Sequence, residues 1–157
     1  MQFDKEDSEL AFATPRTWEM VDHILRFVSD DLEKMFPLVA GLIGSGTAAE
    51  LYAWTKIYQE LPEMSDIFDG KNPPKPNQTD KMYALVSAMT EYARQCLDQK
   101  ERMENSIRYA NSFPADFAAL LFSNYMVLRP NYQKEMLKMP AFQEWIQRKG
   151  RIFNGLL

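Results

Sequence analysis

Apolar residues recur through most of the chain at spacings of three and four positions, which is the period of an α-helix. No stretch alternates between apolar and polar positions as a half-buried strand does. The first helix is predicted after Thr14, which can cap a helix whose first residue is Pro15. One apolar stripe then runs along this helix through Trp18, Val21, Leu25 and Val28. The pattern therefore predicts an all-α protein.

Further helical segments follow along the chain. Thr47 and Glu50 have the spacing of a capping box, which predicts that a helix starts at Thr47. The proline-containing loop 69–78 separates that helix from a long one, which starts at Thr79 or Asp80. The remaining predicted helices lie over about 99–111, between the prolines at 114 and 130, and over 132–139 and 141–149. Together these segments predict a single compact bundle of six or seven helices.

The composition is that of a globular protein with the length of one domain. The chain has 157 residues, of which 46% are hydrophobic and 25% charged, so it is long enough to bury a sizeable core. Its net charge of −4 argues against nucleic acid and anionic membranes as partners, because both need a basic face. No apolar run approaches the roughly 20 residues of a membrane helix. Because the acidic start MQFDKEDSEL is also unlike a signal peptide, we expect a cytoplasmic protein.

Cysteine and histidine, two residue types that often carry chemistry, each occur once. Cys96 is the single cysteine, which excludes a disulfide within the chain, and His23 is the single histidine. These two side chains cannot form a zinc site by themselves, and no metal site is predicted. His23 also has no serine or cysteine partner in a recognisable catalytic motif.

The glycine-rich stretch GLIGSGTAAE resembles a phosphate-binding loop in part. Gly41 and Gly46 have the spacing of the P-loop motif G-x-x-x-x-G-K-[ST]. However, Thr47 stands where the motif needs its phosphate-binding lysine, and Ala48 stands where it needs a hydroxyl for magnesium. We therefore interpret Gly41, Gly44 and Gly46 as a tight turn that precedes the helix starting at Thr47.

Residues 14–19, TPRTWE, carry a more specific signal. They resemble the T/S-P-R-S/T-W-E opening of the C-terminal lid in MoxR-type AAA+ ATPases. Further segments that resemble the lid follow in the same order: GLIGSGTAAELYAW, YQELP, DKMYALVSAM, FPADFAALL and MPAFQEW. The resemblance spans almost the whole chain but covers only the lid. The Walker A, Walker B and sensor 1 elements of the family lie upstream in such ATPases and are absent from this sequence.

The resemblance implies a lid-like helical domain over residues 14–157, with residues 1–13 as the segment that leads in from a motor domain. It implies that Arg16 is the sensor 2 arginine, which contacts the γ-phosphate of ATP, so Arg16 is the predicted catalytic and cofactor-binding residue. ATP and Mg²⁺ would be ligands of the full-length ATPase, and this chain alone is not expected to be an enzyme. The implied partners are the motor domain in cis and neighbouring subunits of a homo-oligomeric ring.

Other interpretations stay open. Arg16 can instead be a solvated arginine that pairs with Glu19 or Asp22. The chain can be a piece of a lid, a short protein that kept the lid without the motor, or a free-standing phage or bacterial adaptor without nucleotide chemistry. A nucleic-acid binder that uses the basic cluster of Arg148, Lys149 and Arg151 is disfavoured by the net charge. That cluster is predicted to complement the C-terminal dipole of the last helix instead.

Overall fold

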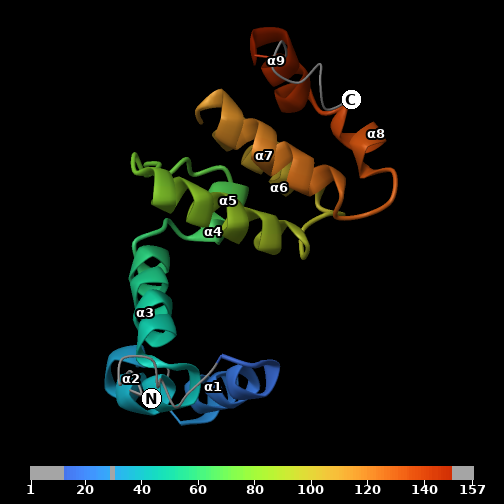
Figure 1. The fold of residues 1–157 in the computed structure, drawn as a ribbon. Helices are drawn as coiled ribbons and strands as arrows, with labels where there is room; N and C mark the ends of the chain where they lie inside the picture. The colour runs from blue at the N-terminus through green and yellow to red at the C-terminus, as the bar shows by residue number, and fades with distance from the viewer. Residues whose placement is uncertain (1–12, 29–30, 150–157) are drawn as a thin grey trace, which may run out of the picture. The chain divides into compact units, whose positions relative to one another are not determined.

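Across residues 13–28 and 31–149, which the computed structural model describes, the chain forms nine helices and no strand (Figure 1). The predicted all-α class is confirmed. The helices are α1 (Pro15–Phe27), α2 (Leu32–Ile43), α3 (Ser45–Gln59), α4 (Met64–Phe68), α5 (Thr79–Ala93), α6 (Lys100–Ala110), α7 (Ala115–Met126), α8 (Tyr132–Met136) and α9 (Pro140–Lys149).

Contacts between residues divide the chain into two compact units, residues 1–59 and residues 60–157. The first unit holds α1 to α3, and the second holds α4 to α9. The sequence pattern predicted one bundle and gave no sign of this division, which falls within the segment YQELP. The segment predicted to lead in from a motor domain lies outside the described residues, apart from Ala13.

Two of the nine helices, α2 and α4, were not predicted. Pro37 lies inside α2 and removes one backbone hydrogen bond, so the sequence there looks unsuited to a helix. The helix forms because it buries Leu32, Val39 and Ile43 on one side. α4 has five residues, which is too short for a helical period to be seen in the sequence.

The glycine-rich stretch forms a helix-to-helix junction with one residue between the helices. α2 ends at Ile43 and α3 begins at Ser45, so Gly44 alone turns the chain, with φ 84° and ψ 151°. Gly41 lies inside α2, and Gly46 lies inside α3. The prediction that a helix starts at a Thr47 cap is therefore wrong, because α3 begins earlier and Thr47 is its third residue.

The first unit has a small core between its three helices. The buried side chains are Val21 of α1, Leu32, Val39 and Ile43 of α2, and Ala48 of α3. The apolar stripe predicted for α1 is only partly buried: Val21 is buried and Leu25 half-buried, whereas Trp18 and Val28 are 39% and 64% exposed. The first unit therefore leaves the large apolar side chains of Trp18 and Val28 in contact with solvent.

The second unit has a larger core that involves all six of its helices. α5 packs on α7, and α6 packs on both α4 and α9. Among the largest fully buried side chains are Phe122, Phe142 and Trp145. The ring of Phe122 meets those of Phe142 and Trp145 edge to face, with centroids 5.2 and 5.0 Å apart. These contacts join α7 to the last described helix.

Side chains from distant parts of the sequence cap the helix ends in the second unit. The Glu104 carboxylate of α6 accepts a hydrogen bond from the backbone N–H of Ala141, at 2.7 Å, in the first turn of α9. The Lys149 ammonium donates to the carbonyl of Phe113, at 2.8 Å, just beyond the end of α6.

Arg148 and Lys149 of the basic cluster lie in the last turn of α9, where positive charge complements the helix dipole as predicted. The ammonium of Lys149 in addition donates to the Phe113 carbonyl beyond the end of α6. Arg148 pairs with Glu144 one turn before it, at 2.7 Å. Arg151 lies outside the described residues.

Candidate functional site

Arg16 lies in the first turn of α1, and the ends of this turn are fixed by two threonines. Thr14 has extended backbone angles, φ −120° and ψ 161°, and is the N-cap of the helix. Its hydroxyl accepts a hydrogen bond from the backbone N–H of Thr17, at 3.2 Å. The Thr17 hydroxyl in turn accepts from the backbone N–H of Thr14, at 2.8 Å. The cap predicted at Thr14 is thus confirmed, and Thr17 completes it as a reciprocal capping box.

The Arg16 side chain is exposed, and its guanidinium makes no hydrogen bond or ion pair with any described residue. Asp22, one of the two carboxylates considered as its partner, pairs instead with Arg26, at 2.7 Å. Asp22 lies six positions after Arg16, on another side of the helix, whereas Arg26 lies four positions after Asp22. The alternative in which Asp22 neutralises Arg16 is therefore contradicted.

α1 has two distinct sides. One carries Val21 and packs on α2. On the other side, Met20, His23 and Phe27 follow Arg16 at four, seven and eleven positions, which places all four along one stripe of the helix. Phe27 is 74% exposed, and its ring centroid lies 4.7 Å from that of His23. This stripe of α1 thus holds one cation followed by apolar and aromatic side chains.

Two cavities in the first unit lie away from Arg16. Their volumes are about 210 and 440 Å³, and Glu33 and Tyr52 line both of them. No residue of α1 lines either cavity. The Lys56 ammonium lies 5.1 Å from the centroid of the Tyr52 ring and 3.6 Å from Glu33. The Lys56 ammonium thus has both an aromatic ring and a carboxylate of its own unit as neighbours.

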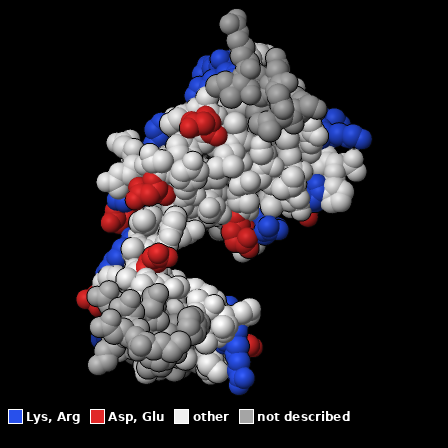
Figure 2. All heavy atoms as spheres, viewed as in Figure 1, with Lys and Arg blue, Asp and Glu red and all other residues white. Residues whose placement is uncertain are grey.

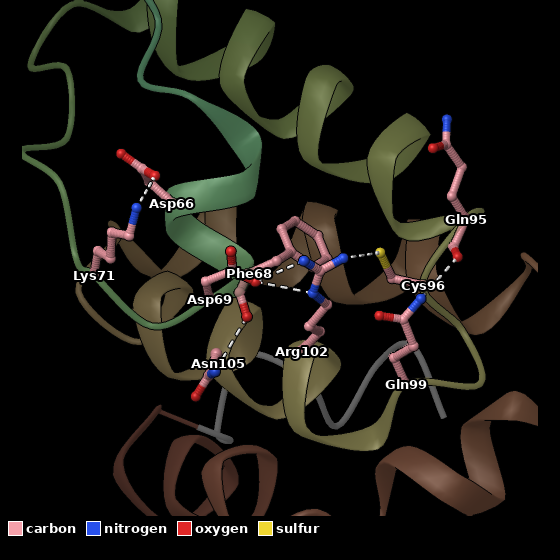
Figure 3. A network of polar contacts seen from close by, with 9 residues as sticks. All are labelled: Asp66, Phe68, Asp69, Lys71, Gln95, Cys96, Gln99, Arg102 and Asn105. Carbon is pink, nitrogen blue, oxygen red and sulfur yellow. Dashed lines mark hydrogen bonds and ion pairs between the residues drawn. The ribbon is translucent and has the colours of Figure 1, made fainter.

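Cys96 belongs to a polar network that holds α4, α5 and α6 together in the second unit (Figure 3). Arg102 of α6 reaches Asp69, at 2.8 Å, and its second amino group lies 4.0 Å from the Cys96 sulfur. The Asp69 carboxylate raises the pKa of Arg102 through a hydrogen bond, which keeps the guanidinium charged. Cys96 itself is 2% exposed. A buried thiol in this setting fits a structural role better than a nucleophilic one.

The charges do not gather on the face shown in Figure 2, where basic and acidic side chains alternate over the described surface. Within the described ranges, no three histidine, cysteine, aspartate or glutamate side chains come together in a way that could hold a metal ion. Among those same helices, none is long and apolar enough to cross a membrane. The one sequence-predicted site residue, Arg16, therefore remains the candidate site of the described chain.

Comparisons with protein-family models, with curated proteins and with solved structures found no match for this chain. The resemblance to the MoxR-type lid thus rests on the sequence segments themselves. The role of Arg16 stays a prediction.

Proposed function

We propose that this chain is the C-terminal helical lid of a MoxR-type AAA+ ATPase, and that Arg16 binds the γ-phosphate of ATP held by a motor domain. The observation that carries this proposal is the state of Arg16. It is an exposed guanidinium, without a partner among the described residues, in a turn that two threonines fix in place. The proposal explains why an ordered turn presents an unneutralised cation.

The electrostatics of the turn favour an anion beside Arg16. A helix N-terminus carries a partial positive charge, so a cation in the first turn is unfavourable by itself. The first turn of α1 contains no acidic residue that would offset this charge. A phosphate beside Arg16 would satisfy both the guanidinium and the helix dipole, and a charge-assisted hydrogen bond of this kind contributes about 1.5–3 kcal/mol.

The first turn of α1 can supply one contact to a phosphate, but it does not hold the residues of a complete nucleotide site. Pro15 has no N–H, and the N–H of Thr17 is already bonded to Thr14. The turn therefore offers mainly the guanidinium, and the remaining phosphate ligands and the Mg²⁺ ligands must come from the motor domain. When bound, Mg·ATP supplies the phosphoryl group, and the contribution of this chain is to bind its terminal oxygens and to hold them in orientation.

The experiment uses a polypeptide in which this lid follows its motor domain, and it measures steady-state ATP turnover. Arg16→Ala should lower kcat by about 10³-fold, the lower end of what an arginine on the transferred phosphate contributes, or by less. Arg16→Lys should restore only part of the rate, because an ammonium lacks the planar fork of a guanidinium. Arg26→Ala is the matched control, since Arg26 is an exposed arginine of the same helix that pairs with Asp22. It should turn over ATP like the parent.

Two results would count against the proposal. The first is parental turnover by a folded Arg16→Ala enzyme. The second is an equal loss for Arg16→Ala and Arg26→Ala, which would show a general effect of charge on α1. The chain without a motor domain sets the baseline and should show no turnover above background.

A second candidate function, a free-standing helical adaptor, is favoured by the apolar surface of the first unit. Phe27, Leu38 and Trp54 are all large and exposed, and such residues in one small unit suit contact with another protein. This candidate needs no role for Arg16. Parental ATP turnover by Arg16→Ala would therefore favour it.

A further inference from the structure

We infer that a cavity in the second unit binds a small organic anion, and that Lys100 and Lys138 hold its charge. The cavity has a volume of about 340 Å³, which lies near the lower end of the roughly 300–1,000 Å³ that is typical of small-molecule sites. Its lining residues lie within the stretches 97–100 and 135–139 and at Arg129. None of them belongs to the first unit, so the inference goes beyond the proposed contact between Arg16 and ATP.

The charges around this cavity leave two lysines without a partner. Asp98 and Glu135 both pair with Arg129, at 2.6 and 2.5 Å. Lys100, the first residue of α6, and Lys138, between α8 and α9, are exposed and make no ion pair with any described residue. Three cations and two carboxylates thus line the cavity, which is an excess of one positive charge. An anion that contacts the two ammonium groups would therefore be attracted without displacing an existing ion pair.

The wall of the cavity at Arg129 also holds buried donors that lack an acceptor. The Nε of Arg129 is buried and donates to no described residue. The guanidinium carbon lies 5.0 Å from the centroid of the Tyr132 ring. The Tyr132 side chain is fully buried, and its hydroxyl likewise has no partner among the described residues. Because buried polar groups are nearly always hydrogen-bonded, an orphaned donor in a lining residue, with a second one next to it, favours an acceptor from outside the described chain.

The apolar part of the lining favours an organic anion over an inorganic one. Met139 is 3% exposed, and Leu97 packs against the core of the second unit; both side chains line the cavity. Burial of one methylene against such side chains strengthens binding by about fourfold. The cavity beside the proline-containing loop lacks this combination, because the ammonium groups of Lys75 and Lys81 are already bonded within the unit. The ligand class is therefore a carboxylate with a short alkyl part.

Titrations of the chain as it is, followed by NMR chemical shifts of the backbone amides, test the inference with three probes. Butyrate should bind saturably and should shift the amides of the lining residues Asp98, Lys100 and Lys138. Acetate, which has two methylenes fewer, should bind about tenfold more weakly. Butylammonium carries an alkyl part with the opposite charge and should not bind. Failure of butyrate to reach saturation, or binding of butylammonium with equal affinity, would overturn the inference.

Substitutions at the two lysines test where the anion binds. Lys100→Gln and Lys138→Gln should each weaken butyrate binding by about fivefold, the upper end of what an exposed ion pair contributes. Lys134→Gln is the matched control, because Lys134 is an exposed lysine of α8 that does not line the cavity. It should bind butyrate like the parent. Equal weakening in all three variants would show a general effect of charge and would overturn the inference. None of these measurements involves Arg16 or ATP, so their outcome is independent of the proposed function.

Discussion

Alanine substitutions of the three glycines between residues 41 and 46 should have opposite effects on stability. Gly44 is the single residue between α2 and α3, and it is buried with φ 84° and ψ 151°. This region of backbone space is accessible almost only to glycine, and forcing another residue into it costs of order 1–3 kcal/mol. Gly44→Ala should therefore destabilise the first unit by about that amount.

Gly41 and Gly46 have the opposite setting. Both lie inside helices, and a Cβ added at either position meets no atom within 4 Å. Alanine there reduces the conformational freedom of the unfolded chain and introduces no clash. Gly41→Ala and Gly46→Ala should each stabilise the unit by about 0.5–1 kcal/mol.

Hydrogen exchange of the α2 and α3 amides during urea titration is a suitable assay, because it follows the first unit separately from the second. The expected order of stability is Gly46→Ala and Gly41→Ala above the parent, with Gly44→Ala below it. Parental stability for Gly44→Ala would refute the reasoning about the turn. Destabilisation by Gly41→Ala and Gly46→Ala would show instead that the absence of a side chain matters at all three positions, as in a ligand-binding loop.

Two further predictions concern the second unit. Glu104→Ala should lower the free energy of unfolding by about 1–3 kcal/mol, because it leaves the Ala141 amide in the first turn of α9 without its acceptor. The control is Glu144→Ala, which removes the exposed partner of Arg148 and should change the free energy of unfolding by less than about 1 kcal/mol in urea denaturation. Equal losses of unfolding free energy in the two variants would contradict the capping role of Glu104. Burial raises the pKa of Tyr109 and of Tyr132 to about 12, while the unfolded phenols ionise near 10. The contribution of these neutral phenols to the free energy of unfolding is therefore complete below about pH 10 and should be lost as the pH rises from about 10 to 12. Urea titrations across this pH range should show a weaker pH dependence of the unfolding free energy for Tyr132→Phe than for the parent. An equal pH dependence in the two proteins would contradict the raised pKa of Tyr132 as its cause.

The features that sequence reasoning predicted correctly are those with local causes. The start of α1 depends on Thr14 and Pro15, which act on the backbone next to them, and the structure places both as expected. The predicted start of α3 was wrong because of a residue outside the local signal. Thr47 and Glu50 form a valid local signal, but the positive φ of Gly44 ends α2 and lets α3 begin two residues earlier.

Features with distant causes could not be predicted from the sequence pattern. α2 exists despite Pro37, because burial of Val39 and Ile43 against the other helices of its unit outweighs one missing hydrogen bond. The cap that Lys149 provides joins residues 36 positions apart. Neither sequence periodicity nor spacing carries information about such contacts.

The contacts described at the candidate site all have local causes. The position of Arg16 in the first turn follows from the motif TPRTWE and is local. That Asp22 pairs with Arg26 also follows from helical spacing, and applying this spacing strictly would have removed Asp22 as a partner of Arg16. The part of Thr17 in the capping box was not predicted, although the sequence places its hydroxyl three residues after the Thr14 cap.

The identity of the anion that Arg16 would bind depends on the whole solvent side of α1. A single exposed guanidinium binds inorganic phosphate, a carboxylate or a nucleotide with little discrimination. Met20 and Phe27, however, continue from Arg16 along the same stripe, and both remain exposed in the described structure. A small anion would leave these side chains in water, whereas a protein surface that holds the anion would cover them and add apolar burial to the ionic contact. The affinity of Arg16 for free ATP therefore says little about its function, which is why turnover with the motor domain present is the measurement that decides it.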